Sequence, residues 1–243
     1  MSMGNIHWHI DGRSTLLLAK IGEIEHLKDL QKGTVYMKPL GFHKQNEKNH
    51  PKLGVGDSKE GIFQEFSPEM GFEMLIDGKK LDDYTHAEIS MNTTNPVFCC
   101  LLVDYSQVRN GALEIRFDPR MFADFANDPT KEYGFLLFEH KGFMERVQSA
   151  CVRNRIGWIA RSVIYTDDFL SRMIVENGLI VPPAFFKKTE LSYQKEFRIL
   201  LYENVEDHYI LDIGDISDIS RIYSREALMN GIKLMIKEED KNV

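Results

Sequence analysis

Apolar and polar positions alternate along this chain in short runs, which predicts many strands and few helices. Residues 15–21 form an apolar run that is typical of a buried strand. Apolar residues then recur at helical spacing across 23–32, and Gly33 ends this predicted helix. A second strand is predicted over 34–37. The order of strand, helix, glycine and strand indicates a compact unit of an α+β or α/β domain.

The alternating and helical spacings of apolar residues also predict strands and helices over most of the remaining chain. They predict a hairpin that starts from a strand at 72–76 and turns at Asp77-Gly78. Further strands are predicted at 86–91, 97–103, 112–115, 133–138, 158–165 and 209–213, helices at 119–125, 143–152 and 169–177, and a helix or strand at 224–236. Residues 41–61 show neither period and are predicted to be a long functional loop. Because no repeat or linker composition interrupts the chain, we expect one α+β domain over residues 1–243, with a mixed, largely antiparallel sheet and flanking helices.

Composition limits the classes of function. Of 243 residues, 43% are hydrophobic and the formal net charge is −7, which describes an ordered chain and argues against a general nucleic-acid binder. Three cysteines, two of them adjacent, give no disulfide framework and favour a reducing compartment. The first residues lack the pattern of a signal peptide, and no apolar run approaches the ~18 residues of a membrane span. We therefore expect a cytoplasmic protein that does not enter a membrane.

The segment 192–202 carries the densest chemistry, since polar and charged residues run directly into an apolar strand. With a period of two, Gln194, Glu196 and Arg198 share one face of the predicted strand, the first two about 7 Å apart. An amide, a carboxylate and a guanidinium in this order suit the binding of a polar ligand. The alternative is a Glu196–Arg198 ion pair on a solvated sheet surface, which is common and weak.

Lys20 stands at the end of the first predicted strand, ahead of the helix, at a place where anionic ligands are commonly bound. A cation there and a carboxylate at Glu196 suit a ligand with phosphates at one end and an electrophilic sugar at the other. The alternative for Lys20 is a side chain that extends into solvent.

Metal-binding patterns are weak. His7 and His9 would face one way on a strand, but a pair of this kind near a terminus is more often exposed than bound to a metal. Asp57 and Glu60 place two carboxylates on the 41–61 loop, as either a hydrophilic turn or a site. The Gly-x-Gly-x-x-Gly, Walker, Gly-x-Ser-x-Gly and His-Glu-x-x-His signatures are absent from the sequence, and we expect no metal.

Separated pieces of the chain together resemble an uncharacterised bacterial and phage family. Its opening is a strand with a polar residue, a helix, a glycine and a strand, matched here by 18–36. A loop with Asp and Glu-Gly follows, matched by Asp57 and 60–61. Its other mark is a late Lys…Tyr-x-x-Glu-x-Arg segment, matched here by Lys188, Tyr193, Glu196 and Arg198.

This layout more distantly resembles the DarT-like ADP-ribosyltransferases, in which a late Gln/Glu-x-Glu carries the catalytic glutamate. The resemblance implies an ADP-ribosyltransferase-like fold, NAD as the substrate, and a role as a toxin or in antiviral defence between bacteria and phage. Glu196 would stabilise an oxocarbenium-like state and activate the acceptor, which Gln194 would position. The residues expected to bind NAD are Lys20, Tyr36, Arg198, Tyr193 and Ser162. Lys20 replaces the Arg or His of that superfamily. Its middle element has no clear counterpart in this chain, and Ser162 and Tyr165, or Tyr36, are candidates for it.

Three hypotheses for function follow. The first is an enzyme that uses NAD to modify a nucleic acid or a protein, or that hydrolyses NAD. The second is a non-catalytic module that binds a nucleotide or a protein in a cleft beside the 41–61 loop. The third is a metal-dependent nuclease using Asp57, Glu60 and Glu196, although the usual Glu-x-Lys on a strand is absent.

Overall fold

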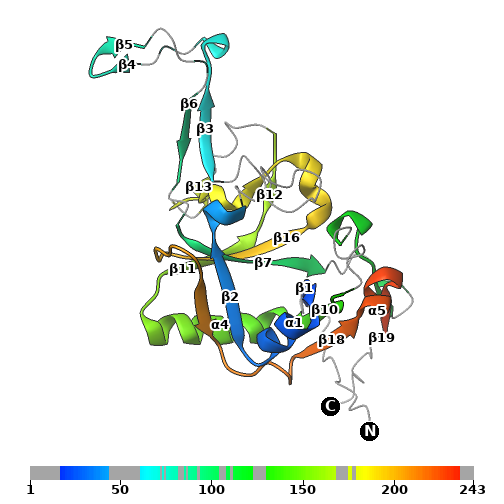
Figure 1. The fold of residues 1–243 in the computed structure, drawn as a ribbon. Coiled ribbons are helices and arrows are strands. Elements are labelled where there is room, and N and C mark those ends of the chain that lie inside the picture. The colour runs from blue at the N-terminus through cyan, green and yellow to red at the C-terminus, as the bar shows by residue number, and fades with distance from the viewer. Residues whose placement is uncertain are drawn as a thin grey trace, which may run out of the picture.

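A single antiparallel sheet organises the computed structural model, which describes residues 17–43, 61–71, 73, 75–81, 85, 87–91, 94–103, 108–109, 112–122, 130–167, 175–176 and 179–235. The path of the sheet runs β11-β16-β7-β1-β10-β18, and β2 joins it to β17 (Figure 1). Its strands are β1 (Leu17–Glu23), β2 (Thr34–Pro39), β7 (Pro96–Val103), β10 (Tyr133–Glu139), β11 (Trp158–Ser162), β16 (Glu196–Leu201), β17 (Tyr209–Asp212) and β18 (Ser220–Ser224). The α+β class and the largely antiparallel sheet predicted from the sequence are confirmed.

β1 lies in the middle of the sheet, and its two neighbours pair with it unequally. It pairs with β10 over its whole length. With β7 it pairs only at Leu17, Leu18 and Ala19, and β7 pairs with β2 instead at Val97 and Pro96. We call the gap between residues 20–23 of β1 and 97–99 of β7 the seam.

Two helices cover one face of the sheet. α1 (Ile24–Gln31) buries Ile24, Leu27 and Leu30, and α4 (His140–Asn154) buries Phe143 and Val147. These side chains pack in one cluster with inward residues of β1, β2, β7, β10 and β16. Both helices were predicted from their helical spacing, and Gly33, at φ 103°, follows α1 as expected.

Short elements cover the opposite face. At one end, β9 (Ala112–Ile115) pairs with β8 (Val108–Arg109) and β19 (Ile232–Met235). Leu113 of β9 and Leu228 of α5 (Arg225–Asn230) pack on Ala19 and Phe135 of the main sheet. At the other end, η5 (Pro183–Phe185) and β15 (Phe186–Lys187) pack on Val97 and Leu200.

A two-stranded ribbon rises from this body (Figure 1). It consists of β3 (Ile62–Phe66) and β6 (Ala87–Ser90), and η1 (Pro68–Met70) follows β3. A smaller hairpin of β4 (Leu75–Ile76) and β5 (Lys79–Lys80) lies near its tip. Asp77 and Gly78, the predicted turn, connect these last two strands and both have positive φ.

Several predicted boundaries differ from the observed ones. The segment 158–165 divides after Ser162, because β12 (Ile164–Tyr165) leaves β16 and pairs in parallel with β15. In the described part of the helix expected at 119–125, residues Pro119–Met121 form a 3-10 turn, η3, which Asp118 caps as predicted, and positions 123–125 lie outside the described residues. The segment 224–236 holds both a helix and a strand, α5 and β19, since Gly231 at φ 78° separates them.

Two further differences concern strands. Residues 175–176, expected in a helix, form β13 and pair with β14 (Leu179–Ile180). β18 was not predicted. The remainder of the predicted 169–177 helix, positions 44–60 of the predicted loop with Asp57 and Glu60, and the His7–His9 pair lie outside the described residues. Over the part of the chain that is described, no helix has the length and hydrophobicity to cross a membrane.

Candidate functional site

Gln194, Glu196 and Arg198 lie close together, but not as one face of a strand. β16 begins at Glu196, whereas Gln194 is the last residue of the 3-10 helix η6 (Thr189–Gln194). Lys195 between them has φ 44°, a left-handed conformation that turns the chain. Lys187 of β15 joins the two side chains, since its Nζ donates to Gln194 Oε1 and to Glu196 Oε1, each at 2.8 Å.

These residues form a buried charge cluster, which we call the Glu196 cluster: Lys187, Gln194, Glu196 and Arg198. Arg198 Nε donates to Glu196 Oε2 at 2.7 Å, and its Nη1 donates to the carbonyl of Ala184. The Lys187 and Arg198 side chains are 2% exposed and that of Glu196 is 13% exposed. Burial alone would raise the pKa of the Glu196 carboxyl, but the charges of Arg198 and Lys187 outweigh burial and hold that pKa far below its ordinary value. Glu196 is therefore ionised, and both of its oxygens accept from buried cations.

Tyr165 of β12 fixes the start of β16. The backbone N–H of Glu196 donates to Tyr165 Oη at 2.8 Å. Burial and the nearby charge of Glu196 raise the pKa of Tyr165, so its hydroxyl stays protonated. The Glu196–Arg198 ion pair considered from the sequence thus exists, but it lies inside the protein and holds β12, β15, β16 and η5 together.

The lysine of this cluster is not the one that the sequence singled out. Lys188, which matches the late motif, lies 3.5 Å from Glu190 at the surface. Lys187 lies in the strand next to it and is the buried partner of Glu196. A lysine that follows two phenylalanines gave no sign of burial, because long charged side chains are rarely buried unless they are paired.

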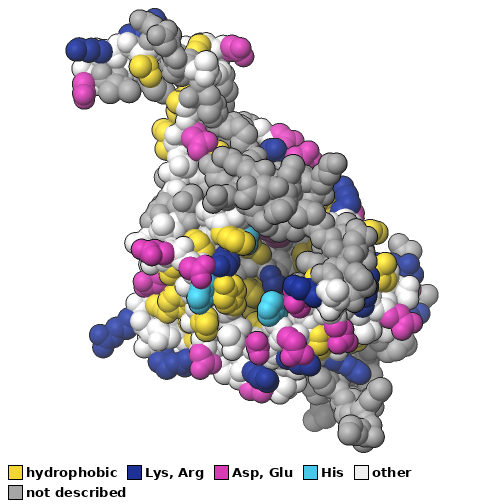
Figure 2. Space-filling view, viewed as in Figure 1, with side chains coloured by type: hydrophobic (Ala, Val, Ile, Leu, Met, Phe, Trp, Pro, Cys, Tyr) yellow, Lys and Arg dark blue, Asp and Glu magenta, His cyan; other side chains and the backbone are white. Residues whose placement is uncertain are grey.

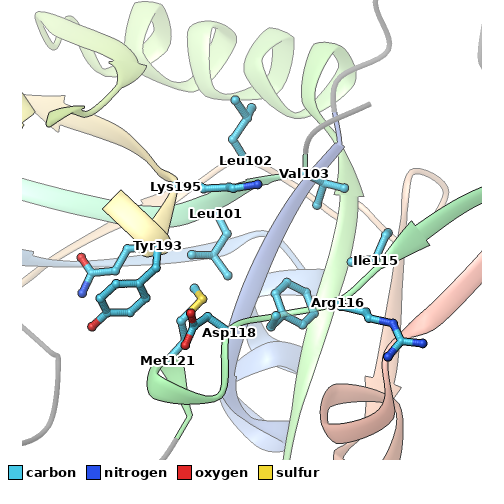
Figure 3. Close-up of a pocket in the computed structure, with 11 residues that line it drawn as sticks. Leu101, Leu102, Val103, Ile115, Arg116, Asp118, Met121, Tyr193 and Lys195 are labelled. Atoms are coloured by element: carbon cyan, nitrogen blue, oxygen red, sulfur yellow. The ribbon is translucent and has the colours of Figure 1, made fainter. Parts of the chain in front are cut away.

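Lys20 lies on the other face of the sheet, in the middle of β1 and not at its end. Leu18 pairs with Leu102 and Glu196 pairs with Leu101. Because side chains alternate along a strand, Lys20 shares its face with Leu102, and Glu196 shares its face with Leu101. Figure 3 shows Leu101 and Leu102 leaving β7 in opposite directions.

A pocket of about 600 Å³ opens at the seam, and we call it the seam pocket. Its apolar lining includes Leu27, Leu30, Phe98 and Ile210. Ile21 and Val97 also border it, although their side chains pack in the clusters on the opposite face of the sheet. Its main polar lining groups are Lys20, His26, Asp29, Tyr36, Lys38 and His43. Figure 2 shows a hollow on the face that carries β2 and α1, with hydrophobic, basic and histidine side chains around it. This size and mixed lining are those of a site for a small molecule.

The ammonium of Lys20 contacts a backbone carbonyl and an aromatic ring in this pocket. Its Nζ donates to the Cys99 carbonyl at 2.7 Å and lies 5.2 Å from the centre of the Phe98 ring. Across the residues that the structure describes, no carboxylate pairs with Lys20. An ammonium has three N–H donors, so two remain for a ligand.

Aromatic rings and charges form the rim of the seam pocket on the β2 side. Tyr36 stacks on His208, with ring centres 5.0 Å apart and planes 21° apart. Lys38 Nζ pairs with Asp207 at 2.6 Å and lies 5.6 Å from the centre of the Tyr36 ring. Asp207 also lies 2.6 Å from His208 Nδ1. Tyr36 therefore presents a ring at this rim whose position is fixed by its neighbours.

Tyr193 and Gln194 line a second pocket, of about 390 Å³, on the Glu196 side of the sheet (Figure 3). The guanidinium of Arg120 lies 3.7 Å from the centre of the Tyr193 ring, and Asp118 binds Arg120 Nη2 at 2.7 Å. Ser162 is exposed at the end of the edge strand β11 and lines neither pocket.

The residues predicted for one site therefore occupy separate places. Lys20 and Tyr36 line the seam pocket, Tyr193 and Gln194 line the second pocket, and Glu196 lines neither. Within the described ranges, no group of three or more His, Cys, Asp or Glu residues is arranged to hold a metal ion.

Comparison of the chain with models of protein families, with curated proteins and with solved structures finds no match. The family resemblance drawn from the sequence therefore stays a prediction, and the function has to be inferred from the two pockets and the Glu196 cluster.

Proposed function

We propose that the protein is a binding module for a small anionic ligand of the nucleotide type, and that the seam pocket is its binding site. The observation that carries this proposal is Lys20, a half-buried ammonium in the pocket lining that forms no ion pair with a carboxylate of the described residues, although Asp29 also lines the pocket. Taking an ammonium out of water is costly unless an opposite charge compensates it. A phosphate of the ligand supplies that charge.

The rest of the pocket suits the remainder of such a ligand. Apolar walls at Leu27, Leu30 and Phe98 accept a planar ring, and Tyr36 and Lys38 add an aromatic face and a second cation at the rim. His43, the last described residue before position 44, also lines the pocket. His43 belongs to the segment 41–61 that the sequence predicts beside a nucleotide-binding cleft, although residues 41–43 are helical and not a loop.

ADP-ribosyl transfer stays a prediction that the geometry favours less. It requires the Glu196 carboxylate to face the substrate, whereas both of its oxygens accept from Lys187 and Arg198. We therefore infer that Glu196 stabilises the fold and that Lys20 binds the ligand.

The test is titration calorimetry with AMP, CMP, GMP, UMP and NAD on the wild type, on Lys20→Gln and on Lys28→Gln. Lys28 is the matched control, because it is an exposed lysine of α1 that pairs with Glu25. Loss of a charge-assisted hydrogen bond predicts an affinity about 10- to 100-fold lower for Lys20→Gln and unchanged for Lys28→Gln. The proposal fails if none of these compounds binds, or if Lys20→Gln binds them as the wild type does.

A further inference from the structure

The direction of the backbone groups in the seam follows from bonds on either side of it. Leu102 N–H donates to the Lys195 carbonyl, so the polar groups of Leu102 point toward β16 and those of Leu101 point toward β1. Glu139 N–H donates to the Ile219 carbonyl, so the backbone N–H and C=O of Glu139 point toward β18 and away from β1. Both bonds lead to the same alternation, in which Leu17, Ala19 and Ile21 turn their N–H and C=O groups toward β7.

Ile21 therefore presents its backbone to the seam pocket, where β7 is no longer its partner. If the pairing of β1 with β7 continued past Ala19, Ile21 would pair with Cys99 and its N–H would donate to the Cys99 carbonyl. That carbonyl instead accepts from Lys20 Nζ at 2.7 Å, and the β1–β7 pairing ends at Ala19–Leu101. Among the residues that the structure describes, the Ile21 N–H therefore has no strand partner and is a donor in the pocket wall, and the Ile21 carbonyl, which has two lone pairs, points the same way.

The neighbouring Gly22 leaves space beside this edge. A Cβ on Gly22 would meet only Leu27 Cδ2, at 3.7 Å, which is an ordinary contact. Packing within the protein therefore does not demand a glycine here, and the missing side chain widens the pocket where a ligand would approach the strand. Glycine in a strand often marks such a close approach.

We propose that the seam reads the base of the nucleotide through the backbone of Ile21, and that it selects a base whose edge carries a ring-nitrogen acceptor next to an amine donor. Adenine and cytosine have this edge. It complements an N–H donor and a C=O acceptor that belong to one strand residue and point the same way. Hypoxanthine and uracil reverse the edge, because they place an N–H and a carbonyl at those positions. This inference rests on the proposed nucleotide binding at Lys20.

The experiment compares AMP with IMP and CMP with UMP by calorimetry, because each pair shares its sugar and phosphate and differs only at the base edge. With IMP or UMP bound, the N–H and C=O of Ile21 would be buried without hydrogen bonds. AMP should therefore bind at least about tenfold more tightly than IMP, and CMP at least about tenfold more tightly than UMP. Hydrogen exchange of the Ile21 amide is the second measurement, and it should slow when AMP is added.

Substitution at Ile21 supplies the matched variants. Proline at this position removes the N–H that faces the seam. It removes no bond to β10, because the backbone N–H and C=O of Ile21 point away from β10. Ile21→Val keeps the N–H. Ile21→Pro should lose the preference for AMP over IMP, and Ile21→Val should retain it. Thermal melting of both variants shows whether they are folded, and amide exchange on the wild type tests the inference independently of the proline variant.

The outcomes separate the two proposals. If none of the four nucleotides binds, the proposed function fails and this inference fails with it. If all four bind equally, with an affinity that depends on Lys20, nucleotide binding stands and reading by Ile21 is overturned. An Ile21 amide whose exchange AMP does not slow also overturns the inference.

Discussion

Lys20 and Glu196 belong to the same sheet, and their side chains leave it on opposite faces. Lys20 donates a hydrogen bond to the Cys99 carbonyl and lines the seam pocket, whereas Glu196 forms ion pairs with the buried Lys187 and Arg198. Substitutions at the two residues should therefore affect different properties, ligand affinity at Lys20 and the free energy of unfolding at Glu196.

Glu196→Ala should strongly destabilise the protein. Removing the carboxylate leaves the Lys187 and Arg198 charges buried without it, and breaking a buried pair in this way costs about 3–5 kcal/mol of unfolding free energy. Urea denaturation followed by circular dichroism measures the loss. Glu25→Ala is the control, since Glu25 pairs with Lys28 at the surface, and it should unfold at the same urea concentration as the wild type. An equal midpoint for Glu196→Ala and Glu25→Ala would contradict the structural task of Glu196.

Acid should weaken the fold through the same residue. Because the Arg198 and Lys187 charges outweigh burial, the folded-state pKa of Glu196 lies below its unfolded value. The cluster therefore contributes fully above the unfolded value of about 4.3, and this contribution is lost as the pH falls from there toward the folded pKa. Melting temperatures between about pH 7 and pH 3 should fall more steeply for the wild type than for Glu196→Gln. Parallel curves would show that another carboxylate dominates.

Gly22 and Gly134 face each other across β1 and β10, yet substitutions there should have opposite consequences. A Cβ on Gly134 would overlap the Tyr223 carbonyl and approach Ile24 Cδ1 to 2.8 Å, so Gly134→Ala should cost about 2–3 kcal/mol of unfolding free energy. Gly22→Val should stay within about 1 kcal/mol of the wild type and weaken nucleotide binding, because its side chain enters the seam pocket. Urea titration and calorimetry measure the two effects. If Gly22→Val bound nucleotides as tightly as the wild type, the nucleotide would not occupy the seam pocket beside Gly22.

The three cysteines should differ in reactivity. Burial raises the pKa of Cys151 to about 11 and raises that of Cys100 well above its ordinary value, so both are almost entirely protonated thiols. Cys99 is half-buried, and because it pairs with Arg198 its side chain lies on the Glu196 face of the sheet. Brief alkylation followed by peptide fragmentation should find the label at Cys99 first. Labelling of Cys100 or Cys151 before Cys99 would contradict this order.

Local patterns predicted the elements that local forces determine. α1 and α4 bury residues at helical spacing, and the turn at Asp77-Gly78 has a pair of residues suited to positive φ. β18 was missed, because its place at the edge of the sheet depends on pairing with β10, which is distant in the sequence. The parallel pairing of β12 with β15 likewise depends on where two distant segments meet.

The candidate site was predicted only in its parts. Gln194, Glu196 and Arg198 do lie together, but Lys187, which joins them, carried no signal in the sequence. The face on which Lys20 lies follows from the register of β1 against β7 and β16, and no pattern in one strand specifies that register. The seam itself results from a pairing that ends at Ala19, and such an end has no signature in amino-acid type.

The central place of β1 has a consequence for the order in which the protein folds. Its neighbours in the sheet, β7 and β10, come from residues 96–103 and 133–139, so the contacts of the first strand span much of the chain. Closing such long loops before any contact is gained makes folding slow. During synthesis, a nascent chain that ends before residue 139 cannot complete the pairing of β1 with β10, and it exposes an apolar strand to chaperones and to other chains.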